Sequence, residues 1–216
     1  MNRRDFLKVA PFAAALPALP FQQEKSKLKI TGIRLVNVKP KRPYPTYKPA
    51  EGSWSTQFVE VANPMSIYPE FKARRELFFA DPGKVPSFTV EIQTGKGISG
   101  YGSGEPGGGE VVVGHLSKLL MGRDPFDIER NWDICWRSTM HYGRMGVTMN
   151  AISGVDLALW DIVGKALNTP VYRLLGGETK DRIPAYCTGN DIEQHVQFGY
   201  TKLKLAIPHG PADGRL

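Results

Sequence analysis

Cysteine and histidine are scarce in this sequence, which has two cysteines and four histidines among 216 residues. Cys135 and Cys187 are far apart, and the histidines share no metal-binding spacing, so neither a metal site nor a Ser-His-Asp or Cys-His grouping can be argued. Two separate buried thiols are favoured over a disulfide. We expect His195 to be exposed on a helix, and His209 is at most a candidate for the rim of a site.

Long apolar runs and basic tracts are also missing. The apolar stretch at residues 9–19 is short and interrupted by prolines, and no later stretch is longer, so no membrane span is predicted. Outside the first residues, no run of lysine and arginine alternates with aromatic side chains, which argues against a nucleic-acid partner. The formal net charge is +7, and residues 1–20 carry three basic residues and one acidic residue, so their removal would leave about +5. A mild positive excess suits a small anionic substrate.

The first twenty residues have the layout of an export signal. Arg3 and Arg4 form a basic region, an apolar stretch follows, and Ala13 to Ala15 offer a cleavage site. The run from Arg3 to Lys8 resembles the twin-arginine signal, which exports folded proteins. We therefore expect residues 1–20 to be removed and the mature protein to be periplasmic or extracytoplasmic, with 21–27 as a polar linker. The alternative is a disordered basic tail.

Hydrophobic periodicity predicts the elements of the middle of the chain. Residues 28–38 alternate like a strand, and 39–70 contain six prolines, which is typical of a long loop that covers a site as a lid. A hairpin is expected over 88–102. Helices are expected over 110–120, 127–140 and 150–167, the last with Asn150 as N-cap and Pro170 as its stop.

The last part of the chain has a different pattern. A buried-type strand at 183–187, a short helix at 191–200 and a second strand at 201–207 predict a βαβ unit and hence a parallel sheet. Two strands cannot bury a parallel sheet, so we interpret this unit as the start of a larger α/β domain that is cut short.

Gly102, Gly104 and Gly107 satisfy the G-x-G-x-x-G dinucleotide fingerprint. The preceding strand belongs to the expected hairpin, and no second strand with an acidic end follows about 20 residues later. A turn or a loop without phosphate contacts is therefore favoured.

Lys202 and Lys204 are two residues apart on the last predicted strand, so both side chains point to the same face. Inside a barrel, two such cations could act on a proton alpha to a carboxylate. On an edge strand they would simply face solvent.

Arg74 and Arg75 follow the lid-like loop. An arginine at this place could bind a carboxylate through paired hydrogen bonds, and the alternative is that both belong to a solvated run of charged residues.

Residues 151–176, AISGVDLALWDIVGKALNTPVYRLLG, resemble the signature of the mandelate racemase/muconate lactonizing enzyme family of the enolase superfamily. Lys202-Leu-Lys204 is similar to that family's Lys-x-Lys motif at the end of the second barrel strand. Further stretches are similar to rhamnonate dehydratase-like sugar-acid dehydratases, namely 63–68, 149–153 and 199–214.

The resemblance implies an α+β capping domain, an antiparallel meander plus helices, over residues 28–180, and the truncated start of an α/β (β/α)7β TIM-like barrel over 181–216. It implies Mg²⁺-dependent proton abstraction alpha to the carboxylate of a sugar acid, and a homo-oligomer at full length. By this resemblance, Lys204 takes the place of the barrel lysine, and Lys202 is the neighbour that tunes it. Arg75 takes the place of a substrate-binding arginine. The family's metal ligands lie on the third to fifth barrel strands, so the resemblance assigns no metal ligand within residues 1–216, and we expect this chain alone to be inactive.

Two departures keep other functions open. The rhamnonate enzymes carry a substrate-contacting histidine in the lid, whereas residues 39–62 contain none, and those enzymes lack a lysine at the place of Lys202. A racemase, epimerase or cycloisomerase of the same superfamily therefore stays an alternative, as does a non-catalytic truncated remnant. The particular sugar acid is not specified.

Overall fold

The computed structural model describes residues 28–39, 41–42, 48, 64–71 and 86–205. Their central element is an antiparallel sheet in the order β1-β2-β3, formed by Ile30–Leu35, Phe88–Thr94 and Ser99–Gly104. The predicted hairpin is confirmed: β2 and β3 pair directly, and Gly97 takes the positive φ of 75° that its turn requires. The predicted first strand is confirmed in a shorter form, because regular pairing with β2 ends at Leu35.

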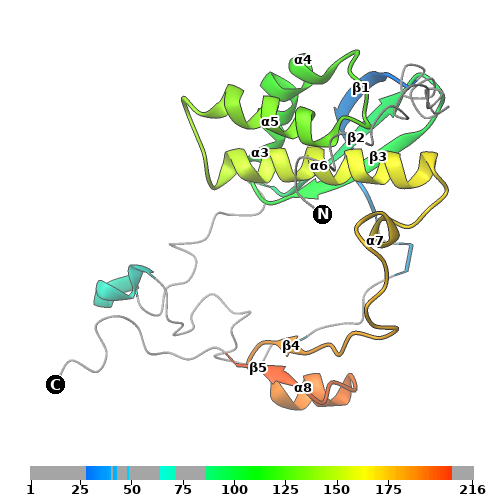
Figure 1. Cartoon of the computed structure of the whole chain (residues 1–216). Helices are drawn as coiled ribbons and strands as arrows, with labels where there is room; N and C mark the ends of the chain where they lie inside the picture. Colours follow the sequence, from blue (N-terminus) through cyan, green and yellow to red (C-terminus); the bar gives the residue numbers. More distant parts are fainter. Residues whose placement is uncertain (1–27, 40, 43–47, 49–63, 72–85, 206–216) are drawn as a thin grey trace, which may run out of the picture.

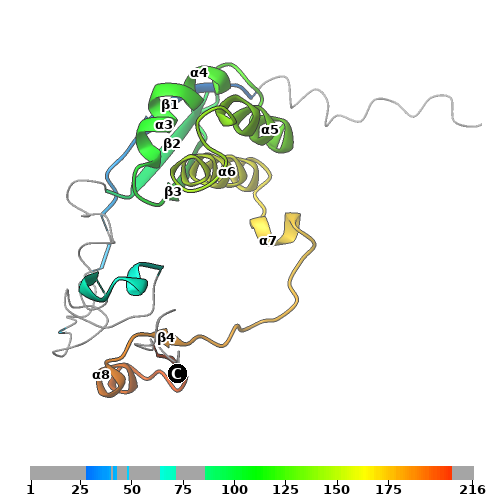
Figure 2. The ribbon, with the colours of Figure 1, turned by 90° about the vertical axis from the view of Figure 1, so that its left-hand side faces the viewer.

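Helices cover one face of this sheet (Figures 1 and 2). Val90 and Ile92 of β2 are fully buried against them. These helices are α3 (Gly108–Val111), a π-helical turn η4 (Val112–Leu116), α4 (Ser117–Leu120), α5 (Ile128–Thr139) and α6 (Val147–Ala166). A further short helix, α7 (Val171–Leu174), follows α6 and contacts it. The predicted helix over 110–120 is therefore one helical run with a π turn in its middle, a local distortion that periodicity does not reveal.

The start of α6 corrects the sequence prediction. Asn150 is not the N-cap, because its amide donates to the carbonyl of Gly146 at 2.9 Å and thus already belongs to the helical ladder. The helix begins at Val147, and Gly146 precedes it with φ 61° and ψ −129°, a conformation that favours glycine. Its end agrees with the expected stop before Pro170.

The backbone of α6 lies unusually close to β3. A Cβ atom at Gly100 would overlap the carbonyl oxygen of Ala158, and one at Gly102 would overlap that of Gly154. Gly154 in turn leaves room for the ring of Phe88, whose atoms lie 2.8 Å from where its Cβ would be. The glycines of β3 thus serve helix packing. Because β3 is one arm of an antiparallel hairpin, the topology is also not that of a dinucleotide-binding unit, as the sequence indicated.

The C-terminal part of the described chain forms a separate small unit (Figure 1). It consists of β4 (Cys187–Thr188), α8 (Ile192–Gln197) and β5 (Leu203–Lys204), and its two strands pair in parallel, which confirms the predicted βαβ arrangement. The strands are shorter than predicted. The interpretation of 183–187 as a buried-type strand is wrong for most of its length, because Ile183 is 84% exposed.

The prediction that His195 is exposed is also wrong. Its side chain is only 3% exposed, and its ring lies against Gly189, where a Cβ atom would be 2.8 Å from Cε1. The short helix α8 carries His195 on the side that faces Gly189, just after β4. The polarity of this side chain and the shortness of its helix therefore do not indicate exposure to solvent.

Replacement of Gly102 by alanine tests the close contact between α6 and β3. The new methyl group would force backbone atoms apart, and we expect Gly102→Ala to lower the free energy of unfolding by about 2–3 kcal/mol. Gly114→Ala is the matched control, because nothing lies within 4 Å of its Cβ position and the residue is helical. This control should be neutral or slightly stabilising. Urea denaturation of both variants measures the difference, and equal stabilities would contradict the packing role.

Candidate functional site

The two predicted active-site lysines lie on β5 and its first flanking residue. Lys204 pairs with Thr188 of β4, and the carbonyl oxygens of Lys202 and Lys204 accept hydrogen bonds from the amides of Cys187 and Gly189, each at 3.0 Å. Because the two residues are two positions apart on an extended, paired segment, both side chains lie on the same face of this small sheet. Both lysines are exposed in the described part of the chain.

The structure does not describe the remaining predicted site residues. Arg74, Arg75 and His209 lie outside the described residues, as does most of the lid-like loop. Of its last part, the short 3₁₀ helices η1 (Pro64–Ile67) and η2 (Pro69–Phe71) are described. The structure therefore supports the side-by-side placement of Lys202 and Lys204, and it does not test the role of Arg75.

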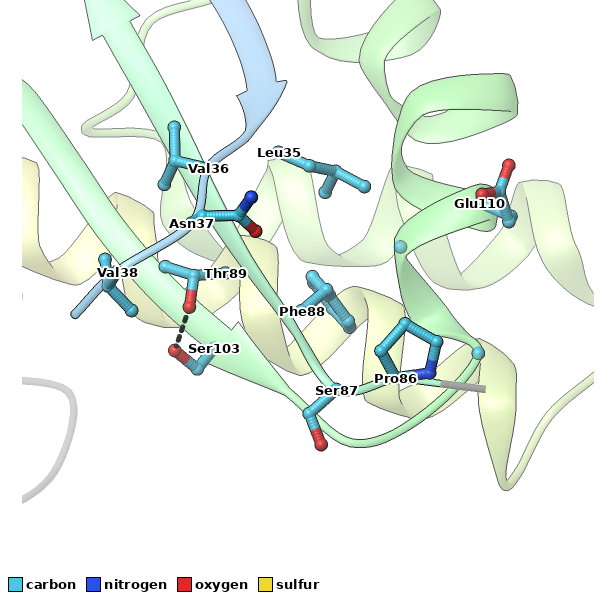
Figure 3. Close-up of a pocket in the computed structure, with 12 residues that line it drawn as sticks. Leu35, Val36, Asn37, Val38, Pro86, Ser87, Phe88, Thr89, Ser103 and Glu110 are labelled. Carbon is cyan, nitrogen blue, oxygen red and sulfur yellow. Dashed lines mark hydrogen bonds between the residues drawn. The ribbon is translucent and has the colours of Figure 1, made fainter. Parts of the chain in front are cut away.

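A cavity that the sequence did not indicate lies at one end of the antiparallel sheet. It has a volume of about 480 Å³ and is found where the chain leaves β1 and enters β2, beside the start of α3 (Figure 3). Asn37 borders this space from the chain just after β1, Phe88 borders it from β2, and Glu110 borders it from α3. The lining residues are Leu35, Val36, Asn37, Val38, Pro86, Ser87, Phe88, Thr89, Ser103, Gly107, Gly109 and Glu110.

The lining of this cavity determines what it could bind. The described residues that line it include hydroxyl groups, one amide and one carboxylate, and no lysine or arginine. Thr89 and Ser103 already share a hydrogen bond of 2.9 Å. Such a lining suits hydroxyl groups and disfavours an anion. No local pattern in the sequence marks this site, because its lining comes from segments that are far apart along the chain.

A network of charged and polar side chains crosses the opposite face of the sheet. Arg34, Glu91 and Tyr101 face one another across β1, β2 and β3. Glu91 accepts hydrogen bonds from Arg34 Nε at 2.6 Å and from the Tyr101 hydroxyl at 3.0 Å. The bond from Arg34 is the main reason that the pKa of Glu91 lies below its usual value, and the same carboxylate raises the pKa of Tyr101.

The two cysteines are both free, as the sequence indicated. Cys135 on α5 is 1% exposed, and burial raises the pKa of its thiol to about 12, so it is chemically inert in the folded protein. Cys187 is only half-buried, which corrects the expectation of two buried thiols.

No metal site is found in the part of the chain that the structure describes. Among these residues, no three His, Cys, Asp or Glu side chains gather in a way that could hold an ion. Within the same residues, no helix is both long and apolar enough to cross a membrane.

Comparisons with known proteins agree with the resemblance seen in the sequence. Residues 78–176 match the profile described as "Mandelate racemase / muconate lactonizing enzyme, N-terminal domain". An L-rhamnonate dehydratase of Saccharopolyspora erythraea is 38% identical over 168 residues, which cover 76% of this chain and 42% of that protein.

Solved structures point the same way. The crystal structure of L-rhamnonate dehydratase from Gibberella zeae is similar with a TM-score of 0.70 and 33% identity, over 87% of this chain and 44% of that one. A structure of the Gibberella zeae enzyme complexed with Mg gives a TM-score of 0.69 and 32% identity, over 87% of this chain and 46% of that one. The chain therefore spans less than half the length of the relatives it matches.

The acid sensitivity of the fold should depend on Glu91. Because its pKa is lowered in the folded protein, the stability that its charge contributes is present at neutral pH and is lost as the pH falls through the folded-state pKa. We expect Glu91→Gln to lower the free energy of unfolding at pH 7 by about 1 kcal/mol and to make stability less dependent on pH below 5. The exposed Glu105 provides the control variant, Glu105→Gln. Urea melts from pH 3 to 7 measure both, and parallel pH profiles for wild type and Glu91→Gln would contradict the assignment.

Proposed function

The chain belongs to the mandelate racemase/muconate lactonizing enzyme family, whose N-terminal domain matches residues 78–176, and we propose that it is the N-terminal part of a Mg²⁺-dependent sugar-acid dehydratase. Lys204 carries the proposal: it lies on a strand paired in parallel with β4, shortly after the family domain, as a barrel lysine would. The L-rhamnonate dehydratases among its relatives support the reaction class. We infer that β4, α8 and β5 open the barrel domain, residues 181–216, that follows a capping domain at 28–180.

In this proposal the reaction removes a proton from the carbon next to the substrate carboxylate. The hydroxyl group on the following carbon then takes up a proton from an acid group, which we expect on a later barrel strand, and leaves as water. The resulting enol rearranges to a 2-keto-3-deoxy acid. Lys204 acts as a base or electrostatic partner at the proton, with Lys202 beside it to tune it. Arg75 holds the substrate carboxylate through paired hydrogen bonds. The cavity beside Asn37 and the lid-like loop over 39–70 would contact the hydroxyl groups of the sugar chain and so select the substrate.

Mg²⁺ is the cofactor that this family implies, and one relative's structure is described as a complex with Mg. When bound, the ion stabilises the negative charge that develops on the substrate carboxylate. The described residues hold no group that fits it. We therefore expect its ligands on the third to fifth barrel strands, and we expect catalysis to require the complete barrel.

Racemisation or epimerisation is the second candidate, and Lys202 favours it. A pair of bases at one carbon can remove a proton and return it without loss of a hydroxyl group. We also propose export by the twin-arginine route, supported by the run from Arg3 to Lys8, and a homo-oligomeric complete protein, supported by the family resemblance.

Turnover by the complete protein tests the function. Purified enzyme is incubated with a panel of aldonic acids that includes L-rhamnonate, with Mg²⁺ or with EDTA, and 2-keto-3-deoxy acid is measured. We expect Mg²⁺-dependent product, and we expect Lys204→Ala to lower kcat by about 10²–10⁴-fold because the proton-transfer group is lost. Lys180→Ala, at an exposed lysine before the βαβ unit, should leave kcat unchanged.

The same experiment in D₂O separates the alternatives. Exchange of the alpha proton for deuterium without loss of water would replace the dehydratase proposal by racemisation or epimerisation. A complete protein that binds no divalent metal and turns over no acid would instead support a non-catalytic role.

A further inference from the structure

The outer edge of β3 is held by two charged side chains from α6. β3 is an edge strand of the described sheet, and such edges present free backbone amides and carbonyls to which another chain can add a strand. We propose that Asp161 and Lys165 form an edge lock, which closes β3 to strand addition by a second copy of this chain.

The lock occupies the backbone groups that an added strand would need. The amide of Tyr101 donates to Asp161 Oδ2 at 2.9 Å, and Lys165 Nζ donates to the carbonyl oxygen of Ser99 at 2.8 Å. Residues two apart on a strand present their amides and carbonyls to the same side, so these are successive free positions on the outer edge. Asp161 and Lys165 also bond to each other at 2.6 Å, which keeps both side chains in place.

Lys165 reaches around the strand rather than merely touching it. Gly100 and Gly102 face α6, whereas Tyr101 faces the opposite side of the sheet, where it bonds to Glu91. Lys165 starts on α6, and its Nζ lies 4.9 Å from the centre of the Tyr101 ring. Its side chain therefore passes the edge of β3 and places a positive charge there, and a lysine at an edge is a known obstacle to strand addition.

The sequence of β3 explains why a second copy is the relevant partner. The strand reads Ser-Gly-Tyr-Gly-Ser-Gly, with small side chains and no charge, so two copies could pair in antiparallel fashion without repulsion. Glycine-rich strands also specify their register weakly, which makes unintended pairing easier. In the described part of the chain, the charged groups that bond to the outer backbone edge of β3 are those of the lock, Asp161 and Lys165.

A double variant of the complete protein, Asp161→Ala with Lys165→Ala, tests the lock. Asp133→Ala with Arg137→Ala is the matched control, because it removes another exposed ion pair of the same i, i+4 spacing, on α5, with a separation of 2.8 Å. Loss of the lock should raise the hydrogen-exchange rate of the Tyr101 amide by about tenfold, and the control should not. Sedimentation velocity should show concentration-dependent association beyond the wild-type state only for the first variant.

A third variant distinguishes association through the edge of β3 from association caused by faulty folding of the double variant. Addition of Ser103→Lys to it restores a charge beside the edge of β3 without the bonds from α6, and this should return the protein to the wild-type assembly state. The proposal fails if the double variant and its control show the same Tyr101 exchange and the same assembly state, or if Ser103→Lys leaves the association unchanged.

Discussion

The contact between the backbone of α6 and the backbone of β3 is the constraint on which the rest of the described body depends. Gly100 and Gly102 allow the carbonyls of Ala158 and Gly154 to approach the strand directly. At this short separation, Asp161 and Lys165 can reach the edge of β3, and Phe88 can fill the space left by Gly154. With a larger side chain at either glycine, the helix would move outward and these contacts would be lost together.

The body built on this contact is distinct from the residues that would do chemistry. Its interior is apolar, and the Glu91 carboxylate, whose pKa is lowered, is paired within the sheet. Lys202 and Lys204 lie on the separate βαβ unit, and the described cavity lies at the roots of the segment between β1 and β2. This division places rigid structure in one part of the chain and candidate substrate contacts on segments that extend from it.

Much of this arrangement could be predicted from the sequence, and the errors have physical reasons. The hairpin, α5, α6 and the parallel pairing follow from periodicity and from turn residues that act locally. Asn150 was mistaken for a cap because glycine at 146 supplies the chain reversal without a side-chain signal. His195 was mistaken for an exposed residue, and the π turn after Val111 was missed, because both depend on packing between segments. The cavity beside Asn37 is likewise formed by residues from four elements, β1, β2, β3 and α3, and no local pattern marks it.

The pairing of Arg34 with Glu91 has a consequence for the order in which the sheet forms. These residues are 57 positions apart, whereas Glu91 and Tyr101 are separated by a single turn. Closure of a long loop costs more entropy than closure of a hairpin, so we expect β2, β3 and α6 to assemble first and β1 to join last. Until β1 arrives, Glu91 keeps its water and the sheet has only two strands. Docking of β1 is then the step that completes the electrostatic network and commits the domain to its folded state.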